Sequence, residues 1–315
     1  MPVFTRRALI GPIAALLVLA ACQQSTTSPS PSSGATGSSG ASPSAAAQAT
    51  PVATVPTAEL GLAGKLVTCI DIPYPPQEMF DAAGNPTGSD PDIASEIAKR
   101  LGLESRIENS VFDTIIPALV AQKCDMIVSA QNITKDRLGT VNMIPYFQAG
   151  QAFVVAKGNP DAIHTELDLC GKQVAAESGT TEVDYMNGTG GYKGAGLSKK
   201  CTDAGKPAVA AKEFQKDTDA LLALSAGHVS AYFADSPVAG YYTVQQPTQF
   251  ELAGITVEVA LEGISVTRDH PGLGSGIVAA LKSMIADGTY LNILTKYGLQ
   301  DGAVKDSDVA VQTGS

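Results

Sequence analysis

The run from Lys123 to Arg137, KCDMIVSAQNITKDR, carries the pattern of a strand that is buried on both faces. Residues 126–128 are apolar in succession rather than in alternation, which is typical of a strand covered by helices on both sides. Four small or polar residues, SAQN, follow at the carboxyl end, where open α/β sheets bind their ligands. Arg137 comes after a candidate helix N-cap, Thr134, and its planar charged fork suits a carboxylate. A surface arginine after an ordinary strand, loop and helix is the alternative interpretation of this run.

Strand and helix signals alternate through the body of the chain, residues 58–302. We predict strands at 66–72, 125–129, 152–156, 173–176, 229–234, 255–260 and 264–267. We predict helices at 91–101, 112–122, 181–186, 217–226, 273–287 and 289–297. This alternation predicts an α/β fold with a parallel or mixed sheet.

The N-terminus has the features of an export signal. Arg6 and Arg7 precede an apolar stretch, Ala8–Ala21, that is too short for a membrane-spanning helix. The stretch ends in Leu-Ala-Ala-Cys22, which resembles a bacterial lipobox with small residues before the cleavage point. We therefore predict a lipoprotein signal peptide over residues 1–22, with Cys22 lipidated. An ordinary secretory signal with a chance cysteine is the alternative.

The segments on either side of the body are poor in large apolar residues. Residues 23–57 contain only Gln, Ser, Thr, Pro, Gly, Ala and Val, so we expect a disordered linker that tethers the body. Residues 303–315 form a polar tail that we expect to be frayed.

The chain is acidic, with a formal net charge of −10. This charge argues against nucleic acid as a partner and against electrostatic adhesion to anionic lipid. Membrane attachment would therefore depend on Cys22, and a stable anchor needs more than one acyl chain.

Four cysteines lie beyond Cys22, an even number that suggests disulfides in an exported protein. We favour a Cys170–Cys201 bridge, which would fasten a Gly/Lys-rich loop. Cys69 and Cys124 lie on or beside apolar strands, and they either pair or stay as buried thiols. No cysteine or histidine pair has the spacing of a zinc site, so we expect no metal.

Several polar or aromatic residues follow predicted strands or open predicted helices. Tyr74 lies in a proline-stiffened loop, DIPYPP, and Phe112 precedes a helix. Residues 177–184, ESGTTEVD, join a strand to a helix, with Thr181 and Asp184 as a candidate capping box and Gly179 permitting close approach of another backbone. Asp235 ends an apolar strand and could hold an ammonium group. Core packing, simple capping and a satisfied turn aspartate are the alternatives.

A set of these motifs resembles, in order, the polar-amino-acid solute-binding proteins of ABC importers (family 3). The resemblance covers about residues 62–300 and rests on many segments. They are DIPYPP, NPTGSDPDIASEIAKRLGL, FDTIIPAL, KCDMIVSAQNITKDR, MIPYFQAGQAFVVAKGNP, LCGKQVAAESGTT, ALLALSAGHVSAYFADSPVAGYY, LEGISVTRDHPGL and IADGTYLNILTKYGL.

The resemblance implies the two-lobed periplasmic-binding-protein (Venus flytrap) fold with a two-strand hinge. The chain would cross between lobes at about 150–156 and 257–263. Lobe 1 would comprise 58–152 and 261–302, and lobe 2 would comprise 153–260. The implied function is capture of a small polar amino acid outside the cytoplasm and its delivery to a membrane permease with its ATPase subunit. We expect an exported monomer, lipid-anchored to the outer face of the cell membrane, with no cofactor and no chemistry on the ligand.

The family's ligand-binding roles can be carried to matching positions. By this resemblance Arg137, Thr180 and Thr181 hold the α-carboxylate and Asp235 holds the α-ammonium. Tyr74 and Phe112 flank the ligand side chain. The remaining matched positions are Asp71, which contacts a basic side chain in some members, and the strand-end residues Ser129 and Asn132. Asn132, Ala130 and Gln77 depart from the usual residues, which leaves the side-chain specificity open.

Two other functions fit the same fold. One is a periplasmic dehydratase acting on a prephenate-like substrate, for which Asp71 or Glu177 would have to serve as the acid. The other is a sensory ligand-binding domain.

Overall fold

The computed structural model describes residues 50–190 and 195–314. The predicted signal peptide, Cys22 and most of the predicted linker lie outside the described residues. The strands are β1 (Lys65–Ile70), β2 (Met79–Phe80), β3 (Pro86–Thr87), β4 (Glu104–Asn109), β5 (Met126–Ile127), β6 (Asn142–Ala156), β7 (Gln173–Glu177), β8 (Ala210–Phe214), β9 (Ala231–Asp235) and β10 (Phe250–Val266). The helices are α1 (Ser89–Arg100), α2 (Phe112–Val120), α3 (Lys135–Leu138), α4 (Thr181–Asn187), α5 (Leu197–Asp203), α6 (Asp217–Ser225), α7 (Ser236–Gln245), α8 (Pro271–Ala286) and α9 (Thr289–Lys296).

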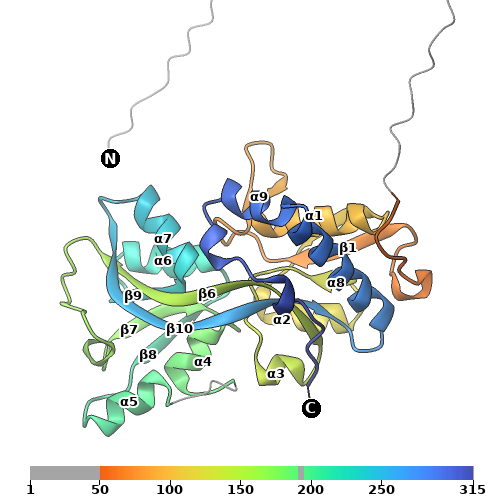
Figure 1. Cartoon of the computed structure of the whole chain (residues 1–315). Helices are drawn as coiled ribbons and strands as arrows, with labels where there is room; N and C mark the ends of the chain where they lie inside the picture. The colour runs from red at the N-terminus through yellow and green to blue at the C-terminus, as the bar shows by residue number, and fades with distance from the viewer. Residues whose placement is uncertain (1–49, 191–194, 315) are drawn as a thin grey trace, which may run out of the picture. The chain divides into compact units, whose positions relative to one another are not determined.

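Eight strands form one mixed sheet, in the order β4-β1-β5-β10-β6-β9-β7-β8 (Figure 1). Strand β1 pairs in parallel with β4 and β5, and β7 pairs in parallel with β8 and β9. Between these two parallel groups, β6 and β10 run antiparallel to each other. We call β4, β1 and β5 with α1, α2, α3, α8 and α9 the first half, and β9, β7 and β8 with α4–α7 the second half. The prediction of a mixed α/β sheet is confirmed.

Strands β6 and β10 join the two halves because each is long enough to pair on both sides. The end of β10 pairs with β5, whereas residues 151–154 of β6 pair with β9. We predicted shorter, separate strands at 152–156, 255–260 and 264–267. The ladder instead continues through shifts in register at Leu252/Thr256, Val257/Ala260 and Glu262/Gly263, where glycine and mixed polarity interrupt the sequence pattern.

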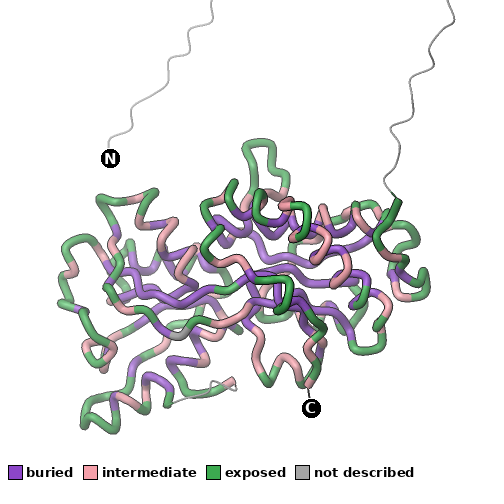
Figure 2. The backbone as a smooth tube through the Cα atoms, in the orientation of Figure 1, coloured by how far each residue is buried: buried purple, intermediate pink, exposed green. Residues whose placement is uncertain are grey.

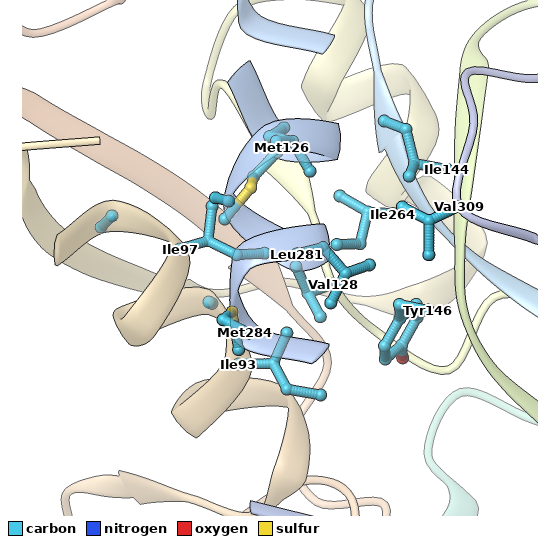
Figure 3. Packing of buried hydrophobic residues seen from close by; sticks show 14 of the residues in the cluster. Ile93, Ile97, Met126, Val128, Ile144, Tyr146, Ile264, Leu281, Met284 and Val309 are labelled. Carbon is cyan, nitrogen blue, oxygen red and sulfur yellow. The ribbon is translucent and has the colours of Figure 1, made fainter. Parts of the chain in front are cut away.

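Each half has a hydrophobic core on both faces of its sheet. In the first half, Met126 and Val128 pack with residues of α1 and α8 (Figure 3). Ile127 lies in the opposite core, with residues of α2. In the second half, Val154 faces α6 and α7, whereas Val155 faces α4 and α5. Successive strand residues thus point to opposite cores, and both are apolar, as predicted for strands covered on two sides. The buried strands run through the middle of both halves (Figure 2). Burying each large aliphatic side chain there contributes about 1.5–3 kcal/mol to the stability of the fold.

The expected disorder of the linker and the expected fraying of the tail are wrong for the parts of these segments that the structure describes. Val55 is buried against the α1–α8 core, and the amide of Val52 donates to the carbonyl of Arg100 at 2.9 Å. In the tail, Val309 is buried and Gln312 bridges to Met143 in β6. A few valines in polar surroundings are sufficient for docking, and the average composition of these segments conceals them.

Each half contains one disulfide. Cys170 is joined to Cys201, with a Cα–Cα distance of 5.5 Å, and Cys69 is joined to Cys124, at 5.7 Å. The first bridge attaches α5, a helix that we had assigned to the Gly/Lys-rich loop. Leu197 and Cys201, four residues apart, are the two buried residues that hold α5 against the second half.

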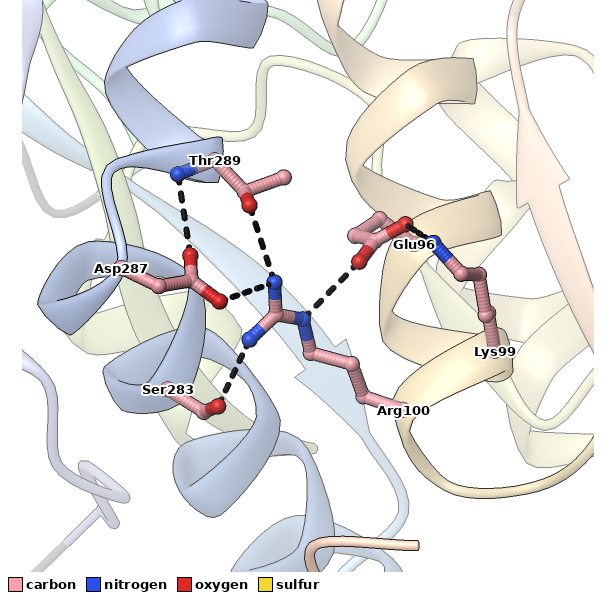
Figure 4. A network of polar contacts seen from close by, with 6 residues as sticks. All are labelled: Glu96, Lys99, Arg100, Ser283, Asp287 and Thr289. Carbon is pink, nitrogen blue, oxygen red and sulfur yellow. Dashed lines mark hydrogen bonds and ion pairs between the residues drawn. The ribbon is translucent and has the colours of Figure 1, made fainter. Parts of the chain in front are cut away.

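A polar network ties α1 to the junction of α8 and α9 (Figure 4). The Arg100 side chain is 12% exposed and makes ion pairs with Glu96, at 3.0 Å, and Asp287, at 2.8 Å. It also donates to the hydroxyls of Ser283 and Thr289. Its position in the last turn of α1 places a cation where the helix dipole favours one.

Among the described helices, none alone is long and apolar enough to cross a membrane. Helices α8 and α9, bent by 79° at their junction, have the required length and composition only when taken as a pair.

Candidate ligand-binding site

A small cavity lies where loops of the first half meet loops of the second half. Its free volume is about 10 Å³, which is room for about one water molecule. An amino acid therefore requires the halves to part before it can enter. The residues that line the cavity are Asp71, Tyr74, Glu78, Phe112, Ser129, Ala130, Asn132, Glu177, Thr180, Thr181, Glu182 and Asp235.

Direct hydrogen bonds join the two halves around this cavity. The Tyr74 hydroxyl donates to Asp235 Oδ2 at 3.0 Å and accepts from the Asp235 amide at 3.0 Å. The Thr181 hydroxyl donates to Asn132 Oδ1 at 2.7 Å. Gly179, at φ +81°, lies so near Asp113 that a Cβ there would be 2.8 Å from the Asp113 Cα. The prediction that Gly179 permits close approach is confirmed, and the approach is between the two halves.

Arg137 lies beside the cavity and outside its lining. Thr134 caps α3 as predicted and accepts from the Arg137 amide at 3.2 Å. The guanidinium donates to the carbonyl of Asn132 at 2.8 Å and to that of Gly179, in the second half, at 3.1 Å. It also lies over the Phe112 ring, 5.4 Å from its centre. Burial lowers the pKa of Arg137 from its ordinary value, and the negative charges of Glu182, Asp184 and Asp235 act against this shift.

The other residues that we predicted for the site lie in the cavity wall. Ser129 accepts from the Asp71 amide at 3.0 Å, and so braces the end of β1. Thr180 is the N-cap residue of α4, and its hydroxyl donates to the carbonyl of Glu177 at 2.7 Å. The predicted capping box from Thr181 is wrong, because α4 begins at Thr181 and its N-cap makes no side-chain bond to the helix.

Carboxyl groups dominate the chemistry of the cavity, since five of its lining residues are acidic. Burial raises the pKa of Asp71 to about 6. Burial, followed by the charge of Asp71, raises the pKa of Glu177 to about 10. Burial also raises the pKa of Glu182 to about 7, and that of Asp235 well above its ordinary value. Each of these carboxyl groups would be stabilised by a cation placed in the cavity.

Four lining side chains have a buried polar atom without a hydrogen-bond partner among the described residues. The atoms are Glu78 Oε1, Asn132 Nδ2, Glu182 Oε1 and Asp235 Oδ1. Leaving a buried polar atom unpaired typically costs about 1–3 kcal/mol. Three acceptors and one donor around one cavity are the complement of a ligand that is rich in N–H groups.

Of the five acids that line the cavity, two were not predicted from the sequence, and a third was considered only for the enzyme alternative. Glu78 and Glu182 were not among the predicted site residues, and Glu177 was considered solely as an acid for the dehydratase. Glu177 and Glu182 lie at a strand end and in the first turn of a helix, positions that could have drawn attention to them. Glu78 reaches the cavity through a bridge to Tyr74, for which the sequence offers no pattern.

Comparisons with known proteins show which family this chain is similar to. The family model of the bacterial extracellular solute-binding proteins, family 3, matches residues 66–300. The ABC transporter arginine-binding protein 1 of Escherichia coli (strain K12) is 28% identical over 228 residues, 70% of this chain and 85% of that protein. The arginine-binding protein ArgT of Corynebacterium glutamicum is 26% identical over 256 residues, 81% of either chain.

A solved structure, an ancestral arginine-binding protein bound to arginine, is 34% identical with a TM-score of 0.67, and the match covers 75% of this chain and 98% of that one. The fold is therefore the two-lobed one, with the two halves as its lobes. These relatives are binding proteins, and this chain is likewise a binding protein rather than an enzyme. Because the match spans most of its length, the chain belongs to the bacterial extracellular solute-binding proteins of family 3.

Proposed function

We propose that this protein captures an α-amino acid with a cationic side chain between its two lobes and delivers it to an ABC permease. The observation that carries the proposal is the ring of five carboxyl groups around the cavity, three of which have an unpaired oxygen. A neutral or acidic side chain would leave these buried groups without compensation, whereas a cation pairs with them.

Asp235 is our candidate for the ligand's α-ammonium. Its carboxyl is 3% exposed; Oδ2 is already held by Tyr74, and Oδ1 has no partner among the described residues. This arrangement fixes the direction of the carboxyl and leaves one oxygen for a charged N–H donor.

Arg137 is our candidate for the α-carboxylate. Its guanidinium donates to the carbonyls of Asn132 and Gly179, and the second bond must break when the lobes part. A carboxylate is a stronger acceptor than either carbonyl, so the ligand can take their place. Thr180, Thr181, Ser129 and Asn132 supply further polar contacts in this proposal, and Tyr74 and Phe112 flank the ligand.

The side chain of the ligand would then point toward Asp71 and the neighbouring acids. Similar proteins support a cationic side chain, because they are named for arginine, for histidine and for lysine, arginine and ornithine. The lobe boundaries that we propose are 58–152 with 261–302 for the first lobe and 153–260 for the second.

The location and partners belong to the same proposal. Relatives named as periplasmic binding proteins support export. We propose that Cys22 is lipidated and anchors the mature protein, a monomer, to the outer face of the cell membrane. The permease and its ATPase subunit would be its partners.

Ligand retained through purification tests the proposed function. Denatured protein should release a cationic amino acid that mass spectrometry identifies. Thermal shifts with L-arginine, L-lysine and L-histidine should exceed those with L-glutamine and L-glutamate, since only a ligand that binds the folded state raises its stability. A response confined to L-glutamate or L-glutamine would refute the proposal.

A further inference from the structure

We infer that Glu177 is a further ligand-binding residue: with Asp71 of the opposite lobe it forms a two-carboxyl clamp that takes the ligand's cationic group in exchange for a proton. The inference rests on the proposed function, and it adds a residue and a linked proton to it.

The two carboxyl groups come from opposite lobes and meet in the cavity. Asp71 follows β1 and Glu177 ends β7, so both lie at the carboxyl ends of parallel strands. They are 9% and 6% exposed, and both line the cavity. Both face the same small cavity, and the charge of Asp71 contributes to the raised pKa of Glu177. Two carboxylates repel each other and only accept hydrogen bonds, so a proton held by the pair stabilises this arrangement.

Main-chain amides hold both carboxyl groups in place. Asp71 Oδ2 accepts from the Phe112 amide at 2.8 Å, and Glu177 Oε1 accepts from the Asp217 amide at 3.1 Å. One oxygen of each carboxyl is therefore used by the protein, and the other is available to the partner carboxyl or to a ligand. The clamp is preorganised in each lobe and is completed only when the lobes close.

The surroundings of the pair are mainly acidic. Lys216 and Asp113 face Asp71, with Glu78 also near, whereas Asp217 faces Glu177. Lys216 is exposed on the surface, so solvent screens its charge. With the pKa of Asp71 at about 6 and that of Glu177 at about 10, the pair keeps one proton through neutral pH. Burial of two charges without a cation is thereby avoided.

A cationic side chain can replace that proton with charge conserved. The ligand cation enters between the two groups, the Glu177 O–H bond breaks, the proton leaves to solvent, and two carboxylates then face one cation. A guanidinium has five N–H donors in a planar fork and can serve both carboxylates. A neutral amide side chain cannot displace the proton, because it brings no charge to the pair.

Proton release on binding of L-arginine tests the inference. Calorimetry at pH 7 in two buffers with different ionisation enthalpies should give at least about one proton released per arginine for the parent protein. The clamp supplies one of these protons, and Asp235, whose pKa is also raised, adds to the count when it takes the ammonium. Because protons and arginine compete, the affinity should rise with pH by up to about tenfold per pH unit for each proton released.

The variant Glu177→Gln should release about one proton fewer per arginine than the parent protein. It should also bind arginine roughly 10- to 100-fold more weakly, the cost of losing a charged hydrogen bond. Its amide can still donate to Asp71 and accept from the Asp217 amide. Glu213→Gln, an exposed glutamate on the neighbouring β8, is the matched control and should keep both the affinity and the proton count.

Three results distinguish the outcomes. Arginine binding by the parent without proton release overturns the inference and leaves the proposed function standing. Unchanged proton release in Glu177→Gln also overturns it. Absence of binding to any cationic amino acid overturns the proposed function itself. A parent protein that binds arginine and releases no proton overturns the inference even where the variant does not fold.

Discussion

Replacing Asp235 by asparagine should separate the affinity of this protein from its stability. The change removes the negative charge that we assign to the ligand's α-ammonium and keeps the shape of the side chain. Removing the partner of a buried ligand ammonium typically weakens the binding free energy by about 2–5 kcal/mol. This corresponds to a loss of roughly 30-fold to several-thousand-fold in affinity for L-arginine.

The ligand-free protein should respond in the opposite direction. Burial raises the pKa of Asp235 well above its ordinary value, with further contributions from Glu182 and Glu262, so a charge at this position destabilises the folded state. An uncharged asparagine removes this repulsion and can still accept from Tyr74. We therefore expect the ligand-free variant to melt at the same temperature as the parent protein or higher.

Calorimetry with L-arginine and thermal melts without ligand measure the two effects. Asp219→Asn, an exposed aspartate in α6, is the control and should change neither quantity. If Asp235→Asn binds arginine within a few-fold of the parent protein, Asp235 does not hold the ammonium. If instead both affinity and melting temperature fall together, the residue serves the fold rather than the ligand.

Three other predictions concern the stability of the protein. The pKa of Glu182 rises from 4.5 to about 7, which means that the folded state binds the proton more tightly than the unfolded state does. The free energy of unfolding of the ligand-free protein should therefore fall by roughly 3 kcal/mol between pH 4.5 and pH 7 because of this group. Urea titrations at several pH values should show a smaller dependence of this free energy on pH for Glu182→Gln. Arg100→Ala should lower the free energy of unfolding in urea by about 2–3 kcal/mol because the side chain loses four partners. The control Lys99→Ala removes one exposed ion pair and should lower it by less than about 0.5 kcal/mol. Equal losses in the two variants would show that the Arg100 network contributes little. Peptide mapping without reductant should find Cys170 joined to Cys201. Replacing both cysteines of this bridge by serine should remove roughly 3–4 kcal/mol from the free energy of unfolding for a loop of this length. Free thiols at both positions would contradict this pairing.

The periodic parts of the fold were predictable from the sequence, and the half-exposed parts were not. A clear apolar pattern within a short stretch of sequence predicts helices α1, α2, α6, α8 and α9 and the buried strand β5. Strand β4 was missed because ESRIEN is an edge segment with one aliphatic residue. Helix α7 was missed because SPVAGYYTVQ contains Pro, Gly and β-branched residues, and it is packing of Val238, Ala239 and Tyr242 that holds it helical.

The site was predictable in its positions but not in its chemistry. Strand-end residues such as Ser129 and Asp235 were identified, because the carboxyl ends of parallel strands face one crevice. The clustering of acids could not be foreseen, since Asp71 and Glu177 come from different lobes and are brought together by lobe closure. The spacing of residues in the sequence therefore does not predict this contact.

Binding of L-citrulline compared with L-arginine tests the central claim most directly. Citrulline has nearly the shape of arginine but carries a neutral urea group in place of the guanidinium, so the two ligands differ in the charge offered to the buried acids. Calorimetry at pH 7 should give an affinity for arginine at least about 100-fold higher, because citrulline leaves buried carboxyl groups without a cation. Affinities within a few-fold of each other would contradict the account, since the acids of the cavity would then play no part in recognising the side chain.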